Sequence, residues 1–145
     1  MPGSLVFVCP SCLGINRVRA DRLDAGPTCG RCHTRLDTSG KPLPLSDDAL
    51  DRVVQKSPVP VLVDFYADWC APCRVLSPTL EALARDRAGE VIVAKVDTER
   101  FPRNAQRLGV RGIPAVFLFH DGRKVADAAG VRPRAFYEDL LRRVD

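Results

Sequence analysis

The sequence predicts an α/β protein in which helices flank a central mixed β-sheet, preceded by a small cysteine-rich lobe. After residue 46, β-branched apolar runs alternate with segments of helical periodicity, the pattern of a sheet covered by helices. Before residue 37, the chain is rich in Cys, Gly and Arg and has little apolar periodicity. Pro42 and Pro44 lie in the stretch between them, which indicates a semi-stiff linker. We therefore expect a small domain at 1–36, a linker at 37–45 and a main domain at 46–145.

The main domain is predicted to alternate between helices and strands. Ser46 is a good helix N-cap, and Asp47 and Asp48 suit the positive end of a helix dipole, so a helix is expected to about residue 56. Apolar runs predict buried strands, at 59–66, 91–96 and 115–120. Amphipathic stretches predict the other helices, at 71–88, 100–107 and 133–144.

A hairpin is predicted near the end of the chain. Asp121-Gly122 is a strong turn signal, and 124–129 follows it as the returning strand. The earlier strands are joined through a helix, as parallel strands must be. A β-α-β unit joined to a hairpin and a closing helix gives a mixed sheet. In the small lobe, 5–8 and 15–18 are expected to be short strands beside turns.

Composition and charge exclude several classes of protein. The 145 residues are 46% apolar and 28% charged, which is ordinary for a globular protein and excludes a disordered or fibrous chain. No apolar run approaches the ~20 residues of a membrane helix. The first residues lack the basic and apolar regions of a signal peptide, so a cytoplasmic location is expected. The net charge of +4 is too mild to indicate nucleic-acid binding.

Six cysteines form three CxxC pairs, at Cys9/Cys12, Cys29/Cys32 and Cys70/Cys73. The last pair lies between a predicted strand and a predicted helix, where free backbone N–H groups and the helix dipole favour a thiolate. Cys70, at the exposed end, is predicted to attack a substrate disulfide, and Cys73, one turn deeper, to resolve the mixed disulfide. Zinc binding by this pair is the alternative, but the other four cysteines already complete a site.

The first two CxxC pairs are sixteen residues apart, a spacing typical of a four-cysteine zinc ribbon. We predict one structural Zn²⁺ per chain, which would stabilise a segment too small to fold on its own apolar core. The predicted ligands are Cys9, Cys12, Cys29 and Cys32. A rubredoxin-like iron site and a ligand role for His33 are alternatives. Cys29-Gly-Arg-Cys32-His33 also matches the c-type haem pattern, but haem would leave the other pair unexplained.

The run Asp64-Phe-Tyr-Ala-Asp-Trp-Cys-Ala-Pro-Cys73, followed about forty residues later by Gly112-Ile113-Pro114, resembles the thioredoxin family. The resemblance covers 46–145 and implies the thioredoxin fold. With a four-cysteine zinc-ribbon-like domain in front, the whole chain is similar to the thioredoxin-2 type.

The resemblance implies roles for two charged residues. Asp64 interrupts an apolar strand, so burial is expected to raise the pKa of its carboxyl group. The family has an Asp six residues before the first active cysteine, as here, which makes Asp64 a candidate proton acceptor for Cys73. A purely structural buried Asp is the alternative. Lys95 matches a family lysine near that aspartate, with a lysine that merely extends from a strand edge as the alternative.

The resemblance also implies a surface for substrates. Pro114 matches the family's cis-proline, which leaves the backbone of Ile113 free to pair with an extended substrate segment. Trp69 would provide an apolar platform beside the thiolate. Gly130 fits a place where the family's backbone turns tightly near the substrate.

These observations predict a protein-disulfide reductase, a thiol–disulfide oxidoreductase acting on protein disulfides. By resemblance, an NADPH-dependent thioredoxin reductase regenerates it; no haem, flavin or nucleotide is expected in this chain, which has no fingerprint for them. One alternative is a zinc-ribbon adaptor that grips nucleic acid or a partner protein. Another is a redox-sensing holdase with the same fold as a scaffold. The Cys70/Cys73 pair with Asp64 and Pro114 favours the reductase, because a scaffold needs none of them.

Overall fold

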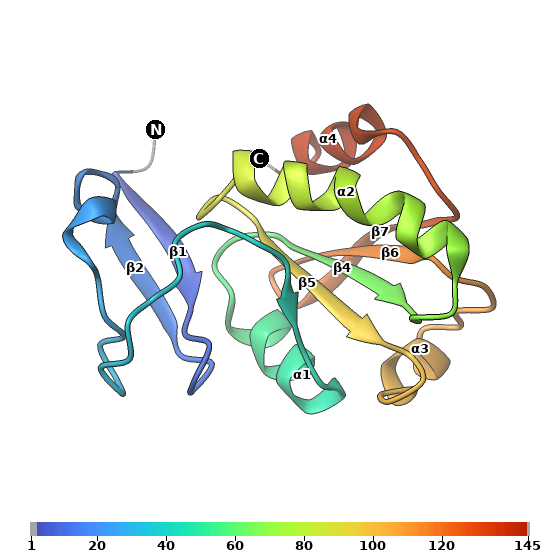
Figure 1. The fold of residues 1–145 in the computed structure, drawn as a ribbon, viewed down its shortest axis with the longest axis horizontal. Helices are drawn as coiled ribbons and strands as arrows, with labels where there is room; N and C mark the ends of the chain where they lie inside the picture. Colours follow the sequence, from blue (N-terminus) through green and yellow to red (C-terminus); the bar gives the residue numbers. More distant parts are fainter. Residues whose placement is uncertain (1–2, 145) are drawn as a thin grey trace.

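A computed structural model describes residues 3–144 as two packed lobes (Figure 1). The N-terminal lobe contains an antiparallel hairpin and a 3-10 helix: β1 (Ser4–Val8), β2 (Ile15–Arg19) and η1 (Ala20–Ala25). The main lobe contains β3 (Leu43–Pro44), α1 (Asp47–Lys56), β4 (Val61–Tyr66), α2 (Ala71–Asp86), β5 (Ile92–Asp97), α3 (Arg103–Arg107), β6 (Ala115–His120), β7 (Arg123–Ala129) and α4 (Arg134–Arg142). Within residues 3–144, no helix combines the length and apolarity that a membrane crossing requires.

The main sheet is mixed, as predicted. Its strand order is β3-β5-β4-β6-β7. β3, β5 and β4 are parallel, whereas β6 is antiparallel to both β4 and β7. α2 supplies the crossover that the parallel pair β4 and β5 requires. Asp121 and Gly122 have φ of 54° and 79°, the positive values that a tight hairpin turn between β6 and β7 favours.

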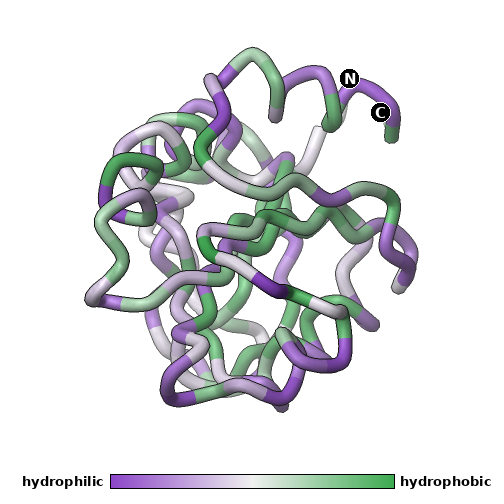
Figure 2. The backbone as a smooth tube through the Cα atoms, turned by 90° about the vertical axis from the view of Figure 1, so that its right-hand side faces the viewer, coloured by the Kyte–Doolittle hydropathy of each residue, from purple (hydrophilic) through white to green (hydrophobic). Residues whose placement is uncertain are grey.

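The two faces of the sheet carry separate apolar clusters because successive side chains of a strand point to opposite faces. In β4, Val61, Val63 and Phe65 pack with residues of α1 and α3. Leu62 packs on the other face with leucines of α2 and α4. Figure 1 shows α2 and α4 over one face of the sheet and α1 and α3 against the other. In Figure 2, hydrophobic (green) segments of the backbone pass through the central part of the molecule. By the same alternation, Asp64 points to the α2 face.

Three helices are shorter than the sequence indicated, and the last of them, predicted at 133–144, spans Arg134–Arg142. The helix predicted at 100–107 begins at Arg103, because Pro102 is its N-cap and a proline disfavours helical backbone in the residue before it. The helix predicted to reach residue 88 ends at Asp86.

Part of the segment predicted as a linker belongs to the sheet. Leu43 and Pro44 form β3, which pairs in parallel with β5, and Leu45 is buried in the core next to α1. A proline is tolerated here because β3 is an edge strand. Gly40, with φ of 81°, lies so close to α2 that a Cβ atom would stand 2.6 Å from the carbonyl oxygen of Ala84. The segment therefore lies packed along the main lobe.

The N-terminal lobe packs directly on the main lobe. Val6 and Val8 of β1 belong to the same apolar cluster as α1 and β5. The backbone N–H of Val6 donates to the carbonyl of Gly89, at 2.9 Å. Gly89 has φ of 83°, and a Cβ atom there would lie 2.4 Å from that of Leu5. The two lobes thus share apolar contacts and a backbone hydrogen bond.

Candidate functional site

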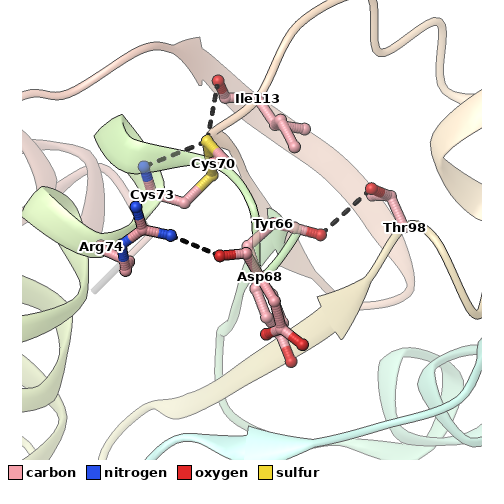
Figure 3. Close-up of a disulfide and its surroundings, with 7 residues drawn as sticks. All are labelled: Tyr66, Asp68, Cys70, Cys73, Arg74, Thr98 and Ile113. Atoms are coloured by element: carbon pink, nitrogen blue, oxygen red, sulfur yellow. Dashed lines mark hydrogen bonds between the residues drawn. A yellow bond between two sulfur atoms is a disulfide. The ribbon is translucent and has the colours of Figure 1, made fainter.

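Cys70 and Cys73 lie where the chain passes from β4 into α2. Cys70 is the N-cap of α2, and its sulfur accepts a hydrogen bond from the backbone N–H of Cys73, at 3.2 Å. Pro72 occupies the first turn, where no intrahelical N–H is lost. The two sulfurs form a disulfide bond, drawn in Figure 3. The sequence therefore places a reversible thiol pair at the positive end of a 16-residue helix.

Overall exposure does not distinguish the two cysteines. We expected Cys73 to be more buried than Cys70, but their exposed fractions are 4% and 3%. Their surroundings do differ. Cys70 lines an open cavity of about 600 Å³, whereas Cys73 lines a separate cavity of about 150 Å³ together with Asp64. The disulfide therefore lies between a groove large enough for a peptide segment and a small polar cavity.

The groove beside Cys70 is lined by two of the residues that the sequence suggested for substrate contact, Trp69 and Ile113. The Ile113–Pro114 peptide bond is cis, and the carbonyl oxygen of Ile113 lies 3.6 Å from the Cys70 sulfur (Figure 3). Trp69 is 66% exposed, so it belongs to the surface of the groove and not to the core. Pro114 and Gly130 are not among the residues that line the groove; Gly130, with φ of 78°, donates its backbone N–H to the Pro114 carbonyl at 2.9 Å.

Sequence reasoning missed one wall of this groove. Pro102, Ala105 and Gln106, in and just before α3, line the cavity that contains Cys70. These residues are about thirty positions away along the chain and carry no motif. Only the packing of α3 beside the end of β5 brings them to the site.

Asp64 lies in the polar cavity behind Cys73. Its side chain is 8% exposed, and its Oδ1 has no hydrogen-bond partner among the residues that the structure describes. Burial raises the pKa of this carboxyl group from 3.8 to about 6, and the positive charge of Lys95 partly opposes the rise. Lys95 faces Asp64 across the β4–β5 pair, and its Nζ lies 4.6 Å from the centroid of the Tyr66 ring. With a pKa of about 6, this carboxyl group can gain and lose a proton near neutral pH.

Replacing Asp64 by asparagine should slow disulfide turnover most at low to neutral pH, where Cys73 depends on an internal base. The same change should stabilise the fold at pH 7. In the unfolded chain Asp64 loses its proton near pH 4, whereas in the folded protein it keeps the proton up to about pH 6. The free energy of unfolding of the unaltered protein therefore falls as the pH rises from about 4 to 6. The Asp64→Asn variant would escape that loss, worth up to about 3 kcal/mol for a pKa raised from 3.8 to about 6.

Denaturant unfolding of both proteins at pH 3 and pH 7, with turnover measured from pH 5.5 to 9, checks this expectation. The stability gain should be present at pH 7 and nearly absent at pH 3. An unchanged pH profile of turnover would remove the base role from Asp64.

The other four cysteines form a compact cluster in the N-terminal lobe. The sulfurs of Cys9, Cys12, Cys29 and Cys32 all lie within 4.8 Å of one another. Two close approaches join one CxxC pair to the other: the sulfurs of Cys9 and Cys32 are 3.5 Å apart, and those of Cys12 and Cys29 are 3.7 Å apart. The cluster of possible ligands in the described chain does not include His33.

Two matching backbone turns present these sulfurs. The N–H groups of Ser11 and Arg31 donate to the sulfurs of Cys9 and Cys29, each at 3.4 Å. Leu13 and His33, directly after the second cysteine of each pair, have φ of 64° and 66°. Each also donates its N–H to the carbonyl of the first cysteine, at 2.9 Å. The repeated turn directs two sulfurs from each pair to one point.

The chemistry of this cluster fits a bound cation. Hydrogen bonds from the backbone of Cys32 and Arg31 lower the pKa of Cys29 to about 6. The Gly14 backbone lowers the pKa of Cys12, but burial and the neighbouring thiols outweigh it and bring that pKa to about 11. Four such close groups cannot all ionise side by side unless a positive ion offsets their charge. A set of four sulfur donors suits Zn²⁺, which binds such sets tetrahedrally.

Comparison with known proteins agrees with both sites. Residues 41–143 match the family model described as Thioredoxin, and residues 8–34 match the one described as Thioredoxin 2, N-terminal. The chain is 35% identical over 126 residues to Thioredoxin C-3 of Corynebacterium nephridii, covering 87% of this chain and 86% of that protein. A mutant thioredoxin from Halobacterium salinarum superposes with a TM-score of 0.66 at 36% identity, over 74% of this chain and 93% of that one.

Two plant proteins are also similar. The chain is 40% identical over 99 residues to Thioredoxin M4, chloroplastic, of Arabidopsis thaliana, and 38% identical over 91 residues to Thioredoxin M-type, chloroplastic, of Pisum sativum. These alignments cover 68% and 63% of this chain. They cover 51% and 53% of the plant proteins, so the chain spans about half their length.

Proposed function

Because the chain belongs to the thioredoxin family and is a thiol–disulfide oxidoreductase of the thioredoxin-2 type, we propose that it reduces disulfide bonds in other proteins through Cys70 and Cys73. The observation that carries this proposal is the position of the disulfide between the substrate-sized groove and the Asp64 cavity. That position gives one cysteine access to substrate and the other access to a proton acceptor.

The reaction begins with both cysteines reduced. The Cys70 thiolate attacks one sulfur of the substrate disulfide, a new S–S bond forms, and the other substrate sulfur leaves as a thiolate that takes up a proton. The backbone N–H of Cys73, 3.2 Å from the Cys70 sulfur, and the helix dipole stabilise the attacking thiolate. The product of this step is a mixed disulfide between Cys70 and the substrate.

Cys73 then resolves the mixed disulfide. It transfers its proton to Asp64 and attacks the Cys70 sulfur, which expels the second substrate sulfur as a thiolate. Two electrons have moved to the substrate, and Cys70 and Cys73 are joined as in the structure. Lys95 keeps part of the Asp64 population ionised, since its positive charge opposes the rise in pKa.

The groove positions the substrate for this exchange. Trp69 offers an apolar surface beside Cys70, and the backbone of Ile113 is available to pair with an extended substrate segment. The hydrogen bond from the Gly130 N–H to the Pro114 carbonyl helps to hold that backbone in place.

The zinc ribbon would hold one structural Zn²⁺ on Cys9, Cys12, Cys29 and Cys32. The ion would supply charge neutralisation and a cross-link in a lobe with little apolar core, and no redox chemistry. We further propose that an NADPH-dependent thioredoxin reductase regenerates the dithiol. We place the protein in the cytoplasm, where reducing conditions keep ligand thiols free.

The trapping of substrates tests this function. With Cys73 replaced by serine, the mixed disulfide cannot be resolved and should accumulate as covalent complexes through Cys70. We expect a disulfide-containing protein such as insulin to appear joined to the variant on a non-reducing gel, and to be released by dithiothreitol. The double variant Cys70→Ser/Cys73→Ser is the control and should trap nothing. Absence of complexes in the single variant would count against Cys73 as the resolving residue.

A further inference from the structure

Helix α3 forms one wall of the groove, but its own residues provide no cap for its N-terminus. It has five residues, and its N-cap, Pro102, makes no side-chain capping bond. A helix this short is marginal alone, and its first backbone N–H groups need acceptors from elsewhere.

Asp47, the first residue of α1, supplies these acceptors. Its Oδ2 accepts the backbone N–H of Arg103 at 3.1 Å, and its Oδ1 accepts that of Asn104 at 3.0 Å. The side chain of Asp47 is only 8% exposed, so water competes little for these bonds. One carboxylate thus lies at the positive ends of two helices and caps α3 across 56 residues of sequence.

Asn104 completes the junction between α1 and α3. It is fully buried, and its Nδ2 donates to the Asp47 carbonyl at 3.2 Å and to Asp51 Oδ1 at 3.0 Å. Its Oδ1 accepts from Arg107 Nη2 at 2.8 Å. The outer edge is closed by the Arg103 guanidinium, which pairs with both Asp48 and Asp51. The buried hydrogen bonds of Asp47 and Asn104, and not the exposed ion pairs of Arg103, specify one position for α3.

The opposite side of α3 faces the substrate groove. Ala105 and Gln106, with Pro102 before them, line the same cavity as Trp69 and Cys70. A shift of α3 would therefore change the width of the groove without moving the sulfurs, which belong to the N-cap and first turn of α2.

We propose that Asp47 is a positioning residue for the substrate groove: by capping α3 it sets the wall against which a protein substrate lies. This inference rests on the proposed reduction of protein disulfides. The junction between α1 and α3 affects how an extended protein segment binds in the groove, and not thiol exchange at Cys70. The rate at which a small disulfide is reduced should therefore not depend on this junction, because such a molecule does not fill the groove.

The variant Asp47→Asn tests this role, because it keeps the shape of the side chain but places an NH₂ group against one backbone N–H. We expect KM for a protein disulfide to rise about fivefold, the change that corresponds to the loss of one capping interaction. The kcat value and the rate with a small aromatic disulfide should stay within about twofold. Amide hydrogen exchange at Arg103 and Asn104 should become faster.

Asp48→Asn is the matched control. Asp48 also pairs with Arg103, but its side chain is 83% exposed and does not reach the α3 backbone, so neither KM nor amide exchange should change. Asp51→Asn tests the junction from its outer side and should shift KM in the same direction by less. Asp51→Asn also replaces Asp47→Asn as the test variant if Asp47→Asn does not fold.

Two results would overturn the inference. One is an unchanged KM despite faster exchange in α3; the other is an equal loss of rate with the small disulfide, which would indicate a general effect on the fold. If the unaltered protein fails to reduce protein disulfides, the proposed function fails instead. Amide exchange in the two variants then still decides whether Asp47 holds α3.

Discussion

Replacing Cys70 by serine should reduce protein-disulfide reduction to the background rate, a loss of about a thousandfold or more. A serine hydroxyl does not ionise near neutral pH, so the nucleophile disappears while its position is kept. The fold should survive, because Cys70 is the N-cap of α2 and serine is a preferred N-cap residue. Insulin reduction driven by dithiothreitol measures the loss, and circular dichroism checks the fold.

The control for this experiment is Val125→Ser, a change of an exposed side chain on β7 that lies outside the groove lining. Its activity should match that of the unaltered protein. Full residual activity in the Cys70 variant would refute the assignment of the nucleophile and, with it, the proposed mechanism.

Replacing Cys9 by serine should abolish stoichiometric zinc binding and unfold the N-terminal lobe. Cys9 and Cys29 are both buried and form part of that lobe's small apolar cluster, with Phe7, Val18 and Leu36. Metal binding to structural sites of this kind is worth on the order of 10 kcal/mol, far more than so small a cluster contributes. We expect amides of β1 and β2 to lose protection from hydrogen exchange, while those of β4 and β5 keep it.

Metal analysis of the reduced protein checks the partition of the six cysteines. The unaltered chain and the double variant Cys70→Ser/Cys73→Ser should each contain about one zinc per chain, whereas the Cys9 variant should contain none. Zinc lost from the double variant, or retained by the Cys9 variant, would show that the cysteines are divided differently.

The fold was predictable where local patterns are strong. The long apolar runs of β4, β5 and β6 and the turn at Asp121-Gly122 were found correctly, since burial and turn chemistry leave clear marks in a sequence. β3 was missed. A two-residue edge strand with a proline has no periodicity of its own, and it exists only because Leu43 and Pro44 lie beside β5.

Part of the site was equally predictable. CxxC spacing within one turn of helix or one tight loop fixes which sulfurs can meet, so the grouping of the cysteines into pairs followed from the chain. The environment of each sulfur could not be predicted from the sequence. Cys70 and Cys73 are almost equally buried but line different cavities, which depends on how α3, Ile113 and Asp64 surround the disulfide.

By itself, then, the sequence determined the fold class, the cysteine pairs and the presence of a carboxylate in a central strand, because these depend on neighbours within a few residues. Only the tertiary structure decided that the N-terminal lobe packs on β5. It also decided that α3 borders the groove, with its first N–H groups hydrogen-bonded to Asp47. Those arrangements arise from contacts between segments far apart in the chain, such as Val6 with Gly89 and Asp47 with Asn104. Such contacts cannot be predicted from a local sequence pattern, because the residues on either side of each contact have nothing unusual in their own sequence neighbourhood.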